Sequence, residues 1–312
     1  GQGSNLSLSF KNHLISTLAS EDAKNLPKNM RKLWEVVISG YTASGGGDYR
    51  LYSWKNNFEK LGNTLIARQE LKNALRPKLK ILPPFYLHAD NSSITNECIS
   101  KIANVEVKLE TDHVHSAYDQ IKIIDGFNDF LPHILTDMSE LLLETLDLMC
   151  EVEISEKMKD NSYIHLPSIS DHDQNRYNYD WTLLVTLCRD AWLATVEIND
   201  DKAKAKAILT LWASSEHPIF RRLVFFALAQ KPDLVSSDTI FSWLLSHESH
   251  WLWSSSTQRE VMRLLVSLSK SLAEDEIQYL QGEILKGPPR TYFINKISDE
   301  NSDILEKLKL HK

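Results

Sequence analysis

Apolar residues in the second half of the chain recur at the three- and four-residue spacing of helices that bury one face. In the first such segment the apolar stripe carries Trp181, Cys188 and Trp192, and Asp180 stands at its start as the predicted N-cap. Five further helix starts are marked by capping residues, by a proline at the first helical position or by acidic residues in the first turn. The six predicted helices begin near residues 181, 200, 218, 237, 257 and 275.

The even spacing of these starts is the strongest structural signal in the sequence. Successive helices advance by about 19 residues, so a helix pair fills about 38 residues, a period between those of tetratricopeptide and HEAT repeats. This regularity predicts a mainly α fold, an α-solenoid of helix pairs in which each pair packs on its neighbours. We expect residues 161–312 to form this regular helical-repeat array.

The third helix of the array is predicted to be its most buried element. It opens at Pro218 and is apolar almost all round, so Phe225 and Phe226 are expected to be inaccessible to solvent. The charged pairs Arg189–Asp190 and Arg221–Arg222 lie on these helices and are expected to tie neighbouring helices together.

The start of the fifth helix also has a sequence signature. Thr257 and Glu260 have the spacing of a capping box, in which each side chain bonds the backbone of the other residue. Trp251 and Trp253 precede this helix in a predicted loop, where packing beneath the loop is favoured over contact with a partner.

The first half of the chain is less regular. Helices are predicted over residues 10–19, 28–39, about 54–76 and about 134–158. Val105–Leu109 alternates like a strand and Ile121–Ile124 is its candidate partner, which predicts a small β hairpin near 105–124. Residues 1–160 are therefore expected to form an irregular helical portion, and the polar segment 159–176 is the predicted joint.

Composition is typical of a globular protein. The 312 residues are 42% hydrophobic and 25% charged, which provides a sizeable core and excludes disorder. The formal net charge of −7 leaves no basic excess for nucleic acid or an anionic membrane surface. Only ten residues are glycine, which disfavours folds built on glycine-rich phosphate loops.

Cysteine usage and hydropathy indicate a cytoplasmic location. Cys98, Cys150 and Cys188 are odd in number and far apart, so a disulfide framework is not expected. The longest apolar run, Leu223–Ala229, is too short to cross a bilayer. The opening Gly1–Ser4 resembles the remnant of a tag, and we expect the chain to be part of something longer.

Motifs for catalysis and for cofactors are incomplete. Two glycine pairs, 40/45 and 282/287, have P-loop spacing, but neither is followed by the lysine and hydroxyl that the loop needs. No signature places a nucleophile beside a base. The histidine pairs 113/115 and 247/250 lack further ligands and are best interpreted as loop histidines. We therefore expect no cofactor, no metal and no enzymatic activity of this chain alone.

An aromatic cluster is the candidate partner-binding site. Tyr49, Arg50, Tyr52 and Trp54 follow the glycine run 45–47. Tyrosine, tryptophan and arginine dominate binding hot spots, because they combine a large contact area with a polar tip. The alternative interpretation is a hydrophobic staple for the helix that starts near Trp54.

Short motifs in the second half resemble a block of large bacterial antiviral STAND NTPases, the AVAST-type antiphage defence proteins. The motifs are His172–Arg176, Asp180–Trp181, Cys188–Trp192, His217–Leu223, Leu252–Ser254, Arg259–Val261 and Leu285–Pro289. The resemblance covers about residues 170–290. Within it, we expect His172, Asn175, Arg189 and Asp190 to be structural residues that join the polar segment to the first regular helix.

The resemblance implies a role in phage sensing. In that family a C-terminal helical-repeat array recognises a phage protein such as the portal or the terminase large subunit, while separate effector and ATPase domains respond. An array without those domains would be a sensor module, and this is the role that the resemblance implies for the chain. Oligomerisation would belong to a full-length protein. Two alternatives are a generic helical-repeat scaffold for a host protein and an enzyme with an unrecognised site.

Overall fold

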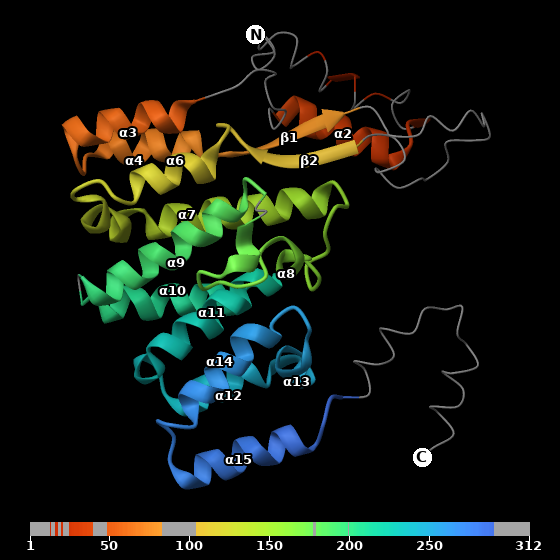
Figure 1. Cartoon of the computed structure of the whole chain (residues 1–312). Helices are drawn as coiled ribbons and strands as arrows, with labels where there is room; N and C mark the ends of the chain where they lie inside the picture. The colour runs from red at the N-terminus through yellow and green to blue at the C-terminus, as the bar shows by residue number, and fades with distance from the viewer. Residues whose placement is uncertain are drawn as a thin grey trace. The chain divides into compact units, whose positions relative to one another are not determined.

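A computed structural model describes residues 13, 16–17, 20, 25–39, 49–82, 104–176, 179–198 and 200–289. The described chain is mainly helical and contains a two-stranded antiparallel sheet (Figure 1). The mainly α fold class is therefore confirmed. The predicted helix over 10–19 lies largely outside the described residues, as do Cys98 and the glycines 45–47.

The chain folds as two compact units. Unit 1 comprises residues 1–167 and 171–205, and unit 2 comprises residues 168–170 and 206–312. The division falls between Ala205 and Lys206, inside a helix, rather than at residue 160.

Unit 1 contains most of the long helices and the sheet. Its elements are α2 (Lys28–Ser39), α3 (Arg50–Leu61), α4 (Leu65–Ala74), β1 (Pro77–Leu82), β2 (Asn104–Leu109), α6 (Val114–Ile121), α7 (Phe127–Glu151), α8 (Ser162–His165), the 3-10 turn η2 (Asp173–Arg176) and α9 (Thr182–Glu197).

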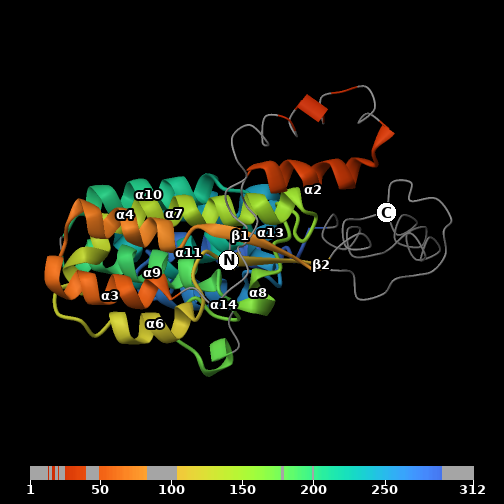
Figure 2. The ribbon, with the colours of Figure 1, turned by 90° about the horizontal axis from the view of Figure 1, so that it is seen from above.

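The predicted helix over 54–76 is a helical hairpin instead. Gly62 adopts a left-handed φ of 59°, which ends α3, and the Thr64 side chain accepts the Ala67 N–H at 3.2 Å to begin α4. The Trp54 indole N–H donates to the Ala67 carbonyl at 2.7 Å and so joins the two helices. Figures 1 and 2 show α3 and α4 side by side, with α6 next to α3.

The predicted strand over 105–109 is confirmed, but its predicted partner is wrong. β2 pairs with β1 in antiparallel register, with Pro77 opposite Leu109 and Leu82 opposite Asn104. Ile121 instead closes α6, where Val114, Ala117, Tyr118 and Ile121 are all buried. Their spacing of three and four residues is that of a helix face, so Ile121 is buried by helical packing and not by a hairpin.

The core of unit 1 lies between α7 and α9, which pack against each other. The helix predicted over about 134–158 begins and ends seven residues earlier, as α7. Ser139 of α7 approaches the Cys188 sulfur of α9 at 3.9 Å, and complete burial raises the pKa of that thiol to about 12. Cys188 is therefore the inert core residue that its place on the apolar stripe predicted.

The start of α9 differs from its prediction. Trp181 occupies the N-cap position and Asp180 makes no cap; its carboxylate lies 3.6 Å from the Lys108 ammonium instead. Trp181 and Trp192 are both buried, as predicted. The Trp192 indole N–H donates to the Ala205 carbonyl of the following helix at 3.2 Å, whereas Trp181 packs against His165.

Unit 2 consists of helices in the described range. Its elements are α10 (Lys202–Ser214), whose first residues belong to unit 1, α11 (Pro218–Gln230), the 3-10 turn η3 (Pro232–Leu234), α12 (Ser237–Leu244), α13 (Ser246–Trp253), α14 (Gln258–Leu268) and α15 (Glu274–Leu285). All six predicted helix starts lie within two residues of an observed start.

The short helix α13 corrects the prediction of a loop at Trp251 and Trp253. Both tryptophans belong to α13, and Trp251 is fully buried. Three consecutive residues, His247, Glu248 and Ser249, adopt left-handed backbone angles and turn the chain between α12 and the tryptophans. Packing beneath the turn, the favoured interpretation of this tryptophan pair, is confirmed for Trp251.

Helix α11 is the centre of unit 2. Every residue from Pro218 to Leu228 is buried, and Phe225 and Phe226 are 0% and 6% exposed, which confirms their predicted burial. The buried Arg221 guanidinium donates to the Ala213 carbonyl at 2.7 Å and to the Trp243 carbonyl at 3.4 Å, near the C-terminal ends of α10 and α12. Burial lowers the pKa of Arg221 to about 10, and the negative ends of the two helix dipoles favour its charge.

The capping box predicted at α14 is absent, because Glu260 has another role. Its carboxylate accepts from the Arg222 guanidinium of α11 at 3.0 and 3.2 Å and from the Ile169 N–H at 2.9 Å. Thr257 donates its hydroxyl to the Trp251 carbonyl at 2.6 Å. The prediction that the pair Arg221–Arg222 ties neighbouring helices together is thus confirmed.

Among the described helices, none has both the length and the apolar character that a membrane span requires.

Phe226→Ala is expected to lower the free energy of unfolding by about 3–5 kcal/mol, because it removes a buried ring and leaves a cavity. Urea unfolding followed by circular dichroism measures the change. Met262→Ala on the exposed face of α14 is the control and is expected to change stability by less than about 0.5 kcal/mol. Equal stability of the two variants would contradict the packing of α11.

The Arg222–Glu260 pair is expected to show strong coupling in a double-mutant cycle. Both side chains are almost fully buried, so Arg222→Met or Glu260→Leu alone leaves a charge without its partner and costs about 3–5 kcal/mol. The double variant is expected to lose less than the sum of the single losses, by about 1–3 kcal/mol. Additive losses in urea unfolding would show that the two charges do not stabilise each other.

Candidate protein-interaction surface

The predicted partner-binding residues lie at the start of α3 in unit 1. Tyr49 precedes the helix and is 56% exposed, Arg50 is its first residue, and Tyr52 is half-buried in its first turn. The structure therefore brings three of the four residues to the surface together.

Trp54, the fourth predicted interface residue, belongs to the core. It is 2% exposed, stacks on Phe58 with ring centroids 4.9 Å apart, and lies within 6.3 Å of the Phe127 and Phe130 rings. A partner cannot reach this side chain in the folded chain. The prediction that Trp54 is an interface residue is therefore wrong, because Trp54 anchors α3 to α4 and α7. The residues of the predicted site that reach the surface are Tyr49, Arg50 and Tyr52.

Tyr49 lies close to two other rings. Its ring stacks on the His113 imidazole, with centroids 5.5 Å apart and an interplanar angle of 12°, and the Tyr52 ring lies 6.2 Å away. His113 has a left-handed φ of 54° at the N-cap of α6, which directs the chain from β2 into that helix. Tyr49 is thus an exposed aromatic side chain with a supported orientation.

Arg50 forms the charged border of this aromatic group. Its guanidinium contacts the Glu110 carboxylate at 2.9 Å, and the same carboxylate lies 3.3 Å from the Lys78 ammonium of β1. The Leu51 N–H also donates to the Thr111 hydroxyl at 3.4 Å. These bonds fix the start of α3 to the turn between β2 and α6, so the tyrosines rest on a rigid base.

A second aromatic group lies around His115, two residues after His113 in the first turn of α6. His115 contacts the Tyr179 carbonyl at 3.0 Å and the Thr182 hydroxyl at 3.3 Å. The Tyr179 ring, 46% exposed, meets the His165 ring edge-on at 4.3 Å. Together the two groups form what we call the aromatic strip: Tyr49, Tyr52, His113, His115, His165 and Tyr179.

Sequence reasoning found the first half of the strip and missed the second. His165 and Tyr179 are far from Tyr49 in sequence, and no local motif marks them. They reach the strip through tertiary contacts: His115 of α6 contacts the Tyr179 carbonyl and the Thr182 hydroxyl, and the Tyr179 ring meets His165 of α8.

The predicted structural motif lies on the same unit. Arg189 donates to Asp171 at 2.8 Å and to Asp190 at 2.7 Å, and Asp190 accepts the Tyr118 hydroxyl at 2.6 Å. Burial and the Asp190 carboxylate raise the pKa of Tyr118 well above its ordinary value, so it remains a hydroxyl donor. The pair Arg189–Asp190 therefore ties α9 to α6 and to the segment at Asp171, as predicted.

The other two residues of the motif lie in that segment. His172 is exposed, and its ring nitrogen Nδ1 accepts the Gln174 N–H at 3.1 Å, while its carbonyl accepts the Asn175 N–H at 2.9 Å. These local bonds shape the turn η2. The prediction that His172 and Asn175 are structural residues, and that changing them leaves partner binding unaltered, stays a prediction.

The histidine pairs weighed as metal sites lie on helices or turns. His113 and His115 are at the start of α6 and not on a strand, and His247 is in the left-handed turn of α13. The part of the chain that the structure describes contains no cluster of three or more histidine, cysteine or acidic side chains arranged to hold a metal ion.

Comparison with known proteins identifies no relative: no family model, curated protein or solved structure matches the chain. The resemblance to the antiviral STAND NTPases therefore stays a prediction.

The stability of the chain is expected to decrease as pH falls from 7 to 5, in part because of His165. Burial lowers the pKa of His165, against a weaker opposite effect of Asp160, so protonation favours the unfolded chain. The stabilisation is present above the unfolded pKa of about 6.5 and is lost as pH falls towards the folded pKa.

His165→Phe keeps a ring against Tyr179 but cannot be protonated. Its melting temperature, scanned from pH 8 to pH 5, is expected to fall less than that of the wild type. A residual fall is expected, since burial also lowers the pKa of His133 and His250. Identical pH profiles for wild type and variant would exclude a role for His165.

Proposed function

We propose that this chain is a protein-binding module that contacts its partner through the aromatic strip of unit 1. The observation that carries the proposal is the exposed Tyr49 ring, which is stacked on His113 and rests on a base fixed by Arg50 and Glu110. Exposed aromatic side chains on rigid elements have large contact area and lose little entropy on binding, which is typical of hot spots.

The architecture of the proposal is a helical-repeat scaffold. Helix pairs of about 38 residues would form an α-solenoid, whose extended surface suits large protein targets. The even spacing of the six helix starts predicted from the sequence supports this arrangement, in which the short helix α13 would be an insertion. The chain itself would bind and not catalyse, and an enzyme with an unrecognised site is the less favoured alternative.

The proposed partner is a phage structural or packaging protein of the portal or terminase large-subunit type. This follows from the resemblance of residues 170–290 to the sensor region of antiviral STAND NTPases. Sensor and target would meet in the cytoplasm of an infected cell. The alternative is a scaffold for a host protein, which the same surface would serve.

The double variant Tyr49→Ala/Tyr52→Ala tests the strip. If the two rings are hot-spot residues that together contribute about 2 kcal/mol, affinity for the partner falls about thirty-fold. Biolayer interferometry with purified portal and terminase large subunit measures binding, and circular dichroism measures melting. Leu65→Ala/Ile66→Ala, at two exposed apolar positions of α4, is the matched control and is expected to bind normally.

Each outcome has a distinct meaning. Lost binding with native melting supports the interface. Normal binding per folded molecule with lowered melting shows that the tyrosines only stabilise the start of α3. Binding of neither phage protein, together with capture of a host protein that depends on Tyr49 and Tyr52, favours the scaffold alternative.

A further inference from the structure

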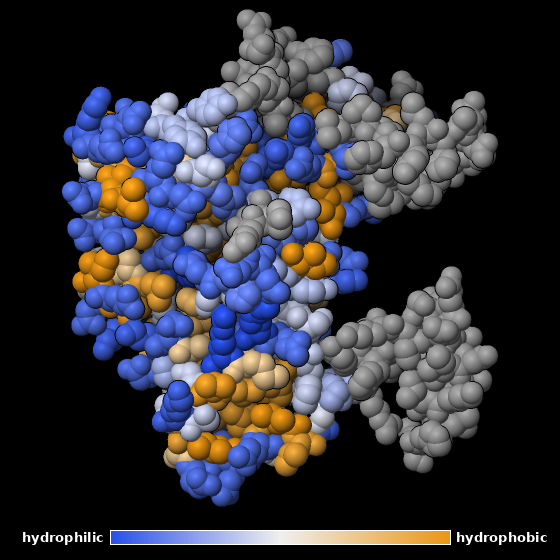
Figure 3. Space-filling model, in the orientation of Figure 1, coloured by the Kyte–Doolittle hydropathy of each residue, from blue (hydrophilic) through white to orange (hydrophobic). Residues whose placement is uncertain are grey.

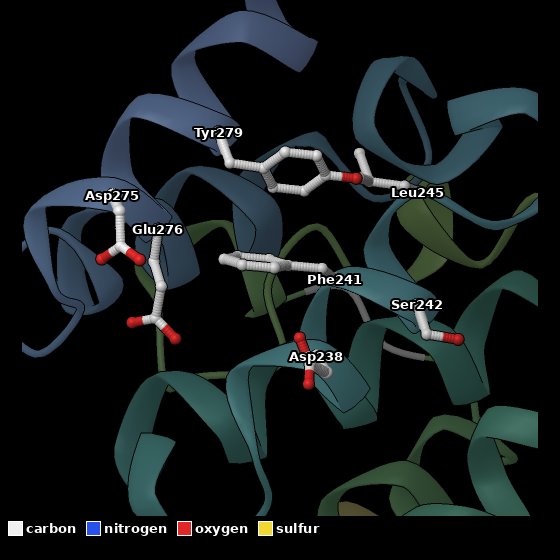
Figure 4. A pocket seen from close by; sticks show the side chains of 7 residues that line it. All are labelled: Asp238, Phe241, Ser242, Leu245, Asp275, Glu276 and Tyr279. Carbon is white, nitrogen blue, oxygen red and sulfur yellow. The ribbon is translucent and has the colours of Figure 1, made fainter.

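A cleft between α12 and α15 of unit 2 combines aromatic and acidic side chains. It encloses about 520 Å³. In Figure 4 the Tyr279 ring lies over the Phe241 ring, Asp275 and Glu276 lie towards one end of the cleft, and Asp238 lies beneath Phe241. The ring centroids are 5.5 Å apart. Leu245 lines the opposite end.

Helix capping accounts for only part of this acidity. Glu276 accepts the Ser237 hydroxyl and the Ala273 N–H, and these bonds lower its pKa and hold it as a carboxylate. Asp238 and Asp275 occupy first turns, where carboxylates complement the helix dipole. A carboxylate that complements a helix dipole needs no apolar wall beside it. The dipole therefore does not explain why aromatic rings lie next to these acidic side chains.

The wall formed by α15 is unusually open. Within this helix Leu280 is the buried residue, whereas Tyr279 and Leu285 are 51% and 86% exposed. Met262 and Val266 of α14 are also exposed. Figure 3 shows apolar surface gathered over α14 and α15. Contiguous apolar surface rimmed by charge is typical of a binding site.

We propose that the α12–α15 cleft binds an extended peptide segment of a protein partner, in which an arginine stands next to an apolar residue. The side chains that line the cleft include three carboxylates and no basic group, so its charge is complementary to a cation. Arginine fits better than lysine, because its planar guanidinium stacks on an aromatic face while its edge donates to carboxylates.

Each part of the segment has a matching part of the cleft. The guanidinium lies on the exposed Tyr279 ring and donates to the carboxylates that line the cleft. Those of Asp238 and Asp275 are not engaged in the capping bonds of Glu276. The apolar neighbour extends towards Leu245 and covers the edge of Phe241. This site is separate from the aromatic strip of unit 1 and does not depend on the function proposed for that strip.

A displayed library of random nine-residue peptides is the probe. Selection on the wild-type chain is expected to enrich peptides with arginine beside an apolar residue. The best peptide, labelled with fluorescein, is then titrated by fluorescence anisotropy. Asp238→Asn/Asp275→Asn and Tyr279→Ala are each expected to weaken its binding at least tenfold.

Two controls keep the test specific. Asp233→Asn/Glu274→Gln removes the same charge from exposed positions outside the cleft and is expected to bind normally. On the peptide side, replacing arginine by citrulline keeps the shape and removes the charge, and is expected to weaken binding to the wild type at least tenfold. That arm remains informative if a cleft variant fails to fold.

Several results would overturn the proposal. These are the absence of enriched peptides, enrichment without arginine, and equal weakening by the cleft and control variants. Concentration-dependent dimers in sedimentation that Tyr279→Ala abolishes would assign the cleft to a second copy of the chain instead. The Tyr49→Ala/Tyr52→Ala variant is expected to bind the peptide as the wild type does, which separates the two sites.

Discussion

The buried ion pair between Arg222 and Glu260 is the interaction on which the packing of unit 2 depends. Two charges removed from water are tolerated only when they meet each other and their remaining bonds are satisfied. Glu260 meets this requirement with Arg222 of α11 and the Ile169 N–H, so a single carboxylate fixes α11, α14 and the segment 168–170. Any shift of α14 along α11 would leave a charge without its partner.

Unit 1 also contains an ion pair that joins separate elements, but its network is more exposed to solvent than the pair in unit 2. Arg189 and Asp190 lie on α9, and their partners Asp171 and Tyr118 come from a turn and from α6. Helices α7 and α9 pack against each other in the core, whereas this network joins α9 to α6 and to the turn at Asp171. The aromatic strip involves the same elements, because α6 carries His115 and Tyr179 lies just before α9.

The two candidate surfaces differ in how they are supported. Tyr49 rests on a histidine ring above a base of ion pairs, and the buried Trp54 anchors the same helix from below. Tyr279 instead belongs to α15, which buries little of its surface. A rigid strip suits recognition of a large folded protein, whereas an open cleft with a loosely packed wall suits an extended segment.

The sequence by itself determined where six helices of the second half begin, since hydrophobic periodicity acts locally and can be read from the chain. It also predicted the burial of Phe225, Phe226 and Cys188, because a helix that is apolar on several sides must be covered. The tertiary structure decided which role a residue has where its type allows several roles. Trp54 is a core residue because α4 and α7 cover it. Glu260 pairs with Arg222 instead of capping its own helix, and β2 pairs with β1 and not with residues 121–124. In each case the deciding contact joins residues distant in sequence. It is selected by the cost of burying a polar group without a partner or of leaving an apolar group in water.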